Sequence, residues 1–203
     1  MSFSRNALVL TLVLSLSGCV TQPTPSSAPT ASSAQQQHLA ALANIKAFSL
    51  KGRLGVVTNP RGFSGTIEWQ HQTDSDNVDV YSPLGSKVAG IVKSPTEVTL
   101  TTQDGRSLSA ADAETLTERS LGFRLPLTGL SDWALGKPTQ SKIDGSSVDE
   151  KGRLLTLKQD GWDISYENYA ANNGVDLPSK IVLKSEKLNL KLLVEQWMSV
   201  EIK

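Results

Sequence analysis

Cys19 is the residue whose type and position point most directly to covalent chemistry. It is the only cysteine in the chain and closes the run Leu16-Ser17-Gly18-Cys19, after a cationic start with Arg5 and an apolar stretch over residues 7–16. A charged region, a short apolar region and small residues before a cut are typical of a secretory signal peptide. The apolar stretch is about half of the ~20 residues that a transmembrane helix needs. We therefore predict a signal peptide over residues 1–18.

The ending Leu-Ser-Gly-Cys resembles the bacterial lipobox, in which the cysteine is lipidated and becomes the first mature residue. A chance cysteine at the end of an ordinary signal peptide is the competing interpretation. We favour a lipoprotein that is exported and anchored through Cys19. Export implies an oxidising compartment, but no second cysteine exists to form a disulfide, so an ordinary hydrophobic core must stabilise the protein.

The remaining side chains offer little for catalysis or metal binding. His38 and His71 are the only histidines. His38 follows the Gln-rich linker and His71 lies between two glutamines, which favours solvated surface positions. No cluster has zinc-ligand spacing, and no phosphate-binding glycine loop precedes a helix. The run Gly62-Phe63-Ser64-Gly65 lacks the spacing of a nucleophile elbow and fits a turn better. We expect no enzyme activity, no catalytic residue, no metal and no cofactor.

Composition and charge place these features in one exported domain. The 20 basic and 20 acidic residues balance, so nothing suggests nucleic acid as a partner. Residues 19–37 hold Cys19 and then a stretch rich in Pro, Ser, Thr, Ala and Gln, which predicts a flexible linker. Residues 38–203 are about the right length for a single domain. Its start, residues 38–47, shows the apolar spacing of a short helix.

Alternation of apolar and polar residues dominates the rest of the chain and predicts an antiparallel meander. Dipeptides with glycine at 104–105, 144–145, 151–152 and 160–161 are turn signals. The predicted strands cover residues 48–56, 65–70, 78–80, 87–92, 96–101, 143–148, 153–158, 162–166, 180–183 and 187–197. A lone sheet and a barrel both fit this pattern, because a large twisted sheet tends to curl.

Two helices are predicted in the middle of the meander. The run Ser109-Ala110-Ala111-Asp112 is a plausible capping box for the first, with Gly122 as its stop. The second begins near Pro126 and ends near Gly136, with Leu127, Leu130, Trp133 and Ala134 as its apolar stripe. These helices can cover an open apolar face of the sheet.

Two features could serve binding. The first is a set of four tryptophans that either pack an ordinary core or line an apolar cavity: Trp69, Trp133, Trp162 and Trp197. Three glycines on the apolar faces either leave room in such a cavity or mark bulges and bends: Gly52, Gly65 and Gly90. The second feature is the turn Ser82-Pro83-Leu84-Gly85-Ser86. Leu84 at its tip either folds back onto the core or presents an exposed apolar side chain to lipid or to a partner.

The chain resembles the LolB family of outer-membrane lipoprotein receptors in Gram-negative bacteria. The matching pieces occur in family order and cover nearly the whole mature domain: the lipobox, the turn at 82–86, Leu125-Pro126-Leu127, the run from Trp133 to Pro138, Lys151 to Leu154, Gly161-Trp162 with Tyr166 and Tyr169, Leu177-Pro178, and the closing strand at 188–197. The family often has Asn before Pro-Leu-Gly, where this chain has Ser82.

The resemblance implies a mainly β (α+β) fold, an incomplete antiparallel β-barrel of about 11 strands with an α-helical lid over an apolar cavity. It also implies a receptor that accepts lipoproteins from the periplasmic carrier LolA and inserts them into the outer membrane. Pro83, Leu84 and Gly85 would form the delivery loop, and Val20, rather than Asp, after Cys19 agrees with outer-membrane placement on the periplasmic face. We expect the cavity, in a monomer, to be lined by some of Leu54, Val56, Ile67, Trp69, Trp133, Trp162 and Trp197.

Other functions stay open at this point. A structural envelope lipoprotein could bind a partner through its sheet, with the core simply filled. A lipid-processing hydrolase is disfavoured because no nucleophile and base are paired in the sequence. The soluble carrier would share the fold, but Cys19 favours the anchored member.

Overall fold

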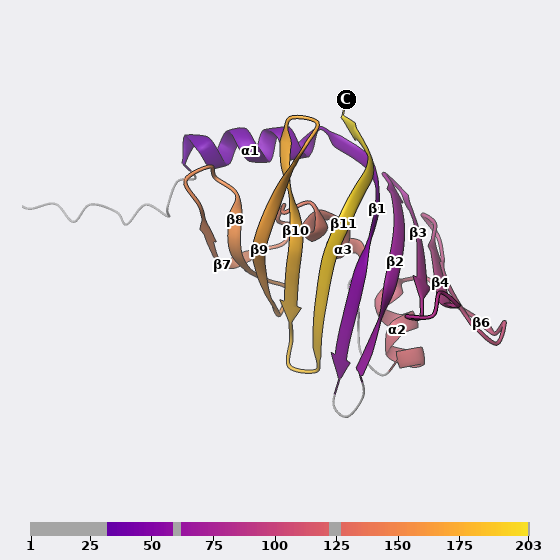
Figure 1. Cartoon of the computed structure of the whole chain (residues 1–203). Helices are drawn as coiled ribbons and strands as arrows, with labels where there is room; N and C mark the ends of the chain where they lie inside the picture. Colours follow the sequence, from indigo (N-terminus) through magenta and orange to yellow (C-terminus); the bar gives the residue numbers. More distant parts are fainter. Residues whose placement is uncertain (1–31, 59–61, 122–126, 203) are drawn as a thin grey trace, which may run out of the picture. The chain divides into compact units, whose positions relative to one another are not determined.

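Antiparallel strands make up most of the computed structural model, which describes residues 32–58, 62–121 and 127–202. Within these ranges the chain forms eleven strands in one unclosed sheet, together with three helices (Figure 1). The predicted mainly β fold class is therefore confirmed. The signal peptide and Cys19 lie outside the described residues.

The strands form two meanders, and the first strand of the chain pairs with the last to join them. Their bounds are β1 Ile45–Thr58, β2 Gly62–Gln72, β3 Ser75–Tyr81, β4 Lys87–Lys93, β5 Val98–Thr102, β6 Ser107–Ala110, β7 Ile143–Val148, β8 Leu154–Gln159, β9 Trp162–Asn172, β10 Val175–Lys184 and β11 Leu188–Ile202. The order across the sheet is β6-β5-β4-β3-β2-β1-β11-β10-β9-β8-β7. The pairing of β1 with β11, from Ile45↔Ile202 to Thr58↔Leu188, is the long-range contact that unites the two halves.

Ten of the eleven strands overlap a predicted strand, but six of them extend three or more residues beyond the predicted bounds. Strand β7 has the predicted bounds, whereas β6 was not predicted. Asp160-Gly161 forms a turn with positive φ at both residues, as short hairpins require. Asp144-Gly145 was wrongly predicted as a turn: it lies inside β7, where the register with β8 shifts between Ile143 and Gly145. The shift marks an irregularity, a site that also favours glycine.

Helix α1, Ser33–Ala43, starts and ends earlier than predicted. The Ser32 side chain accepts a hydrogen bond from the backbone N–H of Gln35, at 3.2 Å, and so caps the helix. Residues 33–37, which the composition assigned to the linker, are therefore helical. Residues 45–47 belong instead to β1.

Helices α2 (Ala113–Leu121) and α3 (Leu127–Ala134) lie between β6 and β7 in the chain. The predicted capping box was wrong in one respect, because Ser109 lies in β6 and its hydroxyl bonds Thr99. Asp112 alone caps α2 and accepts the Thr115 N–H at 2.7 Å. Helix α3 ends at Ala134, and Gly136 follows with a φ of +76°, which suits the glycine that commonly terminates a helix. The predicted stop Gly122, Pro126 and the Leu127 side chain lie outside the described part.

One face of the sheet carries the core. Along β11, buried Leu188, Leu190, Leu192 and Val194 alternate with exposed residues, as a strand with one solvated face requires. Trp133 of α3 is fully buried against this inner face, so the helix covers part of it. The edge strands β6 and β7 are mostly exposed.

Two of the inner-face glycines serve the backbone and do not provide room for a ligand. A Cβ at Gly52 would collide with the carbonyl oxygen of Leu193, next to a register shift in the β1–β11 pairing. A Cβ at Gly65 would collide with the carbonyl oxygen of Tyr81. The structure therefore favours the interpretation that these two glycines mark bends and close approach of the backbone, and not that they leave room in a cavity.

Candidate functional site: an apolar pocket beneath helix α3

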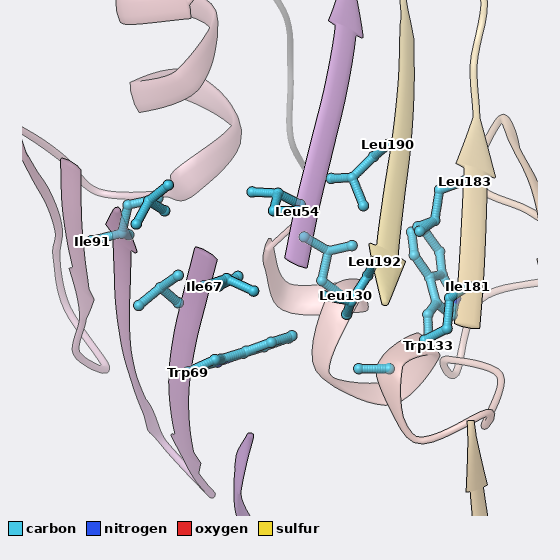
Figure 2. A pocket seen from close by; sticks show the side chains of 13 residues that line it. Leu54, Ile67, Trp69, Ile91, Leu130, Trp133, Ile181, Leu183, Leu190 and Leu192 are labelled. Atoms are coloured by element: carbon cyan, nitrogen blue, oxygen red, sulfur yellow. The ribbon is translucent and has the colours of Figure 1, made fainter. Parts of the chain in front are cut away.

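A pocket of about 80 Å³ lies between helix α3 and the inner face of the sheet, and only apolar residues line it (Figure 2). Strands β1 to β4 of the first half and β10 and β11 of the second half contribute, and α3 closes the other side. The lining residues are Leu54, Ile67, Trp69, Val78, Val80, Ile91, Leu130, Trp133, Ala134, Ile181, Leu183, Leu190 and Leu192. Such a surface can bind an aliphatic chain by exclusion of water, without directional contacts.

The structure brings four of the seven predicted cavity residues together at this pocket. Leu54, Ile67 and Trp69 lie on β1 and β2, and Trp133 lies opposite on α3. Val56, Trp162 and Trp197 lie outside the lining. Nine further lining residues were not predicted for the cavity. Leu130 and Ala134 were predicted only as part of the apolar stripe of a helix, and the other seven share their alternation with many aliphatic side chains of the sheet.

The three outlying residues have other positions in the core. Trp162 packs behind Trp133, with ring centroids 6.3 Å apart, so that it supports the wall and does not line it. Trp197 packs edge-on against Phe48 and donates its indole N–H to the Pro178 carbonyl oxygen at 3.2 Å. Val56 is half-buried, one inner-face position beyond Leu54.

A buried carboxylate holds the Trp69 wall in place. Asp76 is 3% exposed and accepts hydrogen bonds from the Trp69 indole at 2.9 Å, from His71 Nδ1 at 2.7 Å and from Lys93 Nζ at 3.3 Å. Burial alone would raise the pKa of Asp76. The hydrogen bonds from His71 and Trp69 and the nearby Lys93 charge outweigh burial and lower it.

Sequence reasoning missed Asp76, although a signal existed: it shares strand parity with the buried Val78 and Val80. The expectation that His71 is solvated was wrong. Its side chain is 16% exposed and packs against Phe48, with ring centroids 4.9 Å apart. His38 is likewise half-buried, on α1, with its ring near Tyr169.

The Trp133 wall has a similar attachment on the opposite side. Its indole donates to the side-chain oxygen of Gln159 at 3.1 Å, and Gln159 is 1% exposed. The same amide accepts the Thr139 N–H at 3.0 Å and donates to the carbonyl oxygens of Thr139 and Ser141. Gln159 therefore joins the end of α3, the segment after it and β8.

Leu84 is 94% exposed, which excludes the interpretation that it folds back onto the core. The turn is held by backbone bonds from Ser82 N–H to the Ser86 oxygen, at 2.8 Å, and from Gly85 N–H to the Ser82 oxygen, at 2.9 Å. Gly85 has a φ of +85°, which a residue with a side chain rarely adopts. Pro83 and Leu84 are thus presented outward by a turn whose hydrogen bonds involve neither side chain.

Two other site types are absent from the described ranges. No helix there is long and apolar enough to cross a membrane. No group of three or more His, Cys, Asp and Glu residues is arranged there to hold a metal ion.

Known proteins resemble this chain over most of its length. The profile of the family described as outer membrane lipoprotein LolB matches residues 46–197. The outer-membrane lipoprotein LolB of Nitrosococcus oceani is 34% identical over 97% of this chain and 98% of its own length. The corresponding protein of Thiobacillus denitrificans is 35% identical, over 96% and 98%.

A solved structure supports the fold alone. A LolA superfamily protein from Nitrosomonas europaea superposes with a TM-score of 0.50 at 9% identity, covering 87% of this chain and 94% of that one. The family match, and relatives that align over nearly the whole chain, show the family directly. The chain belongs to the LolB family of outer-membrane lipoproteins.

Proposed function

We propose that this protein is an outer-membrane-anchored receptor that accepts lipoproteins from the carrier LolA and inserts them into the outer membrane. The observation that carries the proposal is the pocket beneath α3, whose lining is wholly apolar. In this proposal the pocket shields the client's acyl chains, and the lipid on Cys19 keeps the receptor at the periplasmic face of the outer membrane. It acts as a monomer and uses no cofactor.

The energetic reason for such a pocket is the exposure of acyl chains to water. Each methylene group that leaves water contributes ~0.8 kcal/mol, so a client with long chains cannot cross the periplasm unshielded. A receptor that replaces water with aliphatic and indole surface removes most of this barrier. Transfer can then follow a gradient of affinity from carrier to receptor to bilayer, without nucleotide hydrolysis.

The pocket must widen to hold an acyl chain. Its volume of about 80 Å³ is well below the ~300–1,000 Å³ of typical ligand pockets. Leu130 of α3 is only half-buried, whereas Trp133 is tied to Gln159. We infer that the segment of α3 around Leu130 moves away from the sheet while the Trp133 end stays attached.

The test is transfer of a client between purified proteins. The mature chain (residues 19–203) carrying Cys19→Ala, which removes the anchor, is mixed with a lipoprotein-loaded LolA, and the client is followed by separation of the two proteins. We expect the client to move to this protein. Prior loading of the pocket with pyrene-labelled palmitic acid should reduce that transfer.

An unrelated soluble protein serves as the control acceptor. Failure of this chain to take more client than the control would overturn the proposed function. It would favour instead a structural envelope lipoprotein without a lipid-transfer role.

A further inference from the structure

Burial along the inner faces of β1 and β2 falls steadily toward one end of the strands. Three cross-strand pairs mark the course: Leu50 with Trp69, Leu54 with Gly65, and Val56 with Phe63. The first pair is almost completely buried, at 0% and 4% exposure. Leu54, Gly65 and Val56 are half-buried, and Phe63 is 36% exposed. The apolar inner face is therefore closed at one end and open at the other.

The closed end is packed with aromatic rings. Phe48, 2% exposed, contacts Trp69 and Trp197 edge-on, with centroids 5.2 and 5.4 Å apart. Asp76 fixes the Trp69 indole from the other side. An acyl chain would have to break this packing to leave the pocket in that direction.

The open end lies next to the turn that carries Leu84. Thr66 of β2 pairs with Tyr81, the last residue of β3, and the turn starts at the next residue. A Cβ on Gly65 would lie 2.8 Å from the Phe63 ring and would also meet the Tyr81 carbonyl. The Phe63 ring thus lies over Gly65, on the same face as Ile67 and Trp69, because residues two apart on a strand share a face.

Among the described strands, the opening lies on the β1–β2 side of β1 and not on the β11 side. On β11, which pairs with the other edge of β1, Leu188 and Leu190 are 2% and 6% exposed, although they lie at the same height as Val56 and Thr58. Apolar surface continues from the pocket lining at Leu54 to Val56 and Phe63. This surface is therefore the most accessible path along the inner face of the central strands.

We propose that Val56 and Phe63 frame the portal through which an acyl chain passes between the pocket and the bilayer. The inference rests on the proposed function and adds a direction to it: the chain leaves beside Leu84, at the end of the sheet where that side chain meets lipid. Phe63, whose ring lies over Gly65 and is 36% exposed, is the movable part.

The experiment measures the rate at which a probe leaves the pocket. The mature chain (residues 19–203) carrying Cys19→Ala is loaded with pyrene-labelled palmitic acid and mixed with phosphatidylethanolamine vesicles that contain a quencher. Phe63→Glu should slow transfer about tenfold or more, because a carboxylate in an apolar path costs more than the ~1.4 kcal/mol that a tenfold change represents. Phe63→Ala should transfer at least as fast as the wild type.

Val57→Glu is the matched control. Val57 is 57% exposed and lies next to Val56, on the opposite face of the same strand. The Val57→Glu variant should transfer the probe at a rate within about twofold of the wild-type rate. Wild-type speed in Phe63→Glu, or equal slowing in Val57→Glu, would overturn the portal.

Two further outcomes have defined meanings. If Phe63→Glu is unfolded, as judged by circular dichroism, the transfer rate of Phe63→Ala becomes the test. Slower transfer by Phe63→Ala than by the wild type would refute the portal. A wild-type chain that binds no probe would refute the proposed function itself, so the two failures are distinguishable.

Discussion

Replacing Leu84 with Glu should slow delivery to the membrane without affecting capture. Full burial of a leucine side chain is worth ~1.5–3 kcal/mol. Leu84 is 94% exposed, so its insertion into lipid can contribute ~1.4–2.8 kcal/mol, or about 10- to 100-fold in the population of the membrane-docked form. A glutamate forfeits this gain and adds the cost of placing a charge in an apolar layer.

The fold should tolerate the change. The bonds that hold the turn are made by the backbone of Ser82, Gly85 and Ser86, and by the Ser82 hydroxyl, which accepts the Ser86 N–H at 3.3 Å. The thermal midpoint of Leu84→Glu should therefore match that of the wild type within about 2 °C, as is usual for an exposed site.

Two assays separate the steps: transfer of a client from LolA to the receptor, and transfer from the receptor to liposomes. We expect the first to be unchanged and the second to slow at least about tenfold. Leu193→Glu is the control, because Leu193 is 37% exposed on the outer face of β11, in mid-strand. Normal delivery by Leu84→Glu, or equal slowing by Leu193→Glu, would refute the reasoning.

Three further changes test the anchor and the pocket walls. Cys19→Ala should abolish membrane attachment, and tight binding of that variant to outer membranes would disprove the lipid anchor. Asp76→Asn should lower the free energy of unfolding at pH 7 by about 2 kcal/mol, because charged hydrogen bonds are worth ~1.5–3 kcal/mol. Since the folded-state pKa of Asp76 lies below 3.8, its stabilisation is present above that pH and is lost as pH falls through the lowered pKa. Urea titrations should therefore show the gap between wild type and Asp76→Asn closing under acid conditions, and a constant gap would contradict the role of the charge. Gln159→Leu should cost ~2–4 kcal/mol, because it leaves buried donors and acceptors unpaired, whereas Lys158→Met on the exposed face of the same strand should cost under ~0.5 kcal/mol.

Local pattern was enough to predict most of the elements. Alternation located β7 at its observed bounds, and it located the core positions of β11, because a strand with one solvated face must alternate. Asp160-Gly161 formed the predicted turn, since few residue pairs adopt positive φ at both positions. The ordered motifs also predicted the LolB family, which the comparisons confirm.

Local pattern failed where two structures compete for the same residues. Ser109 suits both a helix cap and a polar edge strand, and pairing with Thr99 of β5 decided for the strand. The start of α1 at Ser33 was hidden in a polar segment whose helix is secured by the Ser32 cap.

The candidate site depended on tertiary structure more than the fold did. Trp69 and Trp162 were both predicted as cavity residues, but only the packing of α3 put Trp69 in the lining and Trp162 behind Trp133. The burial of Asp76 on β3 likewise required Trp69 and His71 of β2 and Lys93 of β4 to meet around it. The exposure of Leu84 was settled by the turn's backbone bonds.

The sequence by itself thus determined the alternating faces, most turns and the family, because these depend on neighbours a few residues apart. Only the tertiary structure decided that the sheet stays unclosed, that β1 pairs with β11 and that the pocket forms under α3. The β1–β11 partners lie more than a hundred positions apart, and the pocket brings α3 against strands that are distant from it in the chain. Their free energy depends on which surfaces meet, and no local pattern encodes that choice.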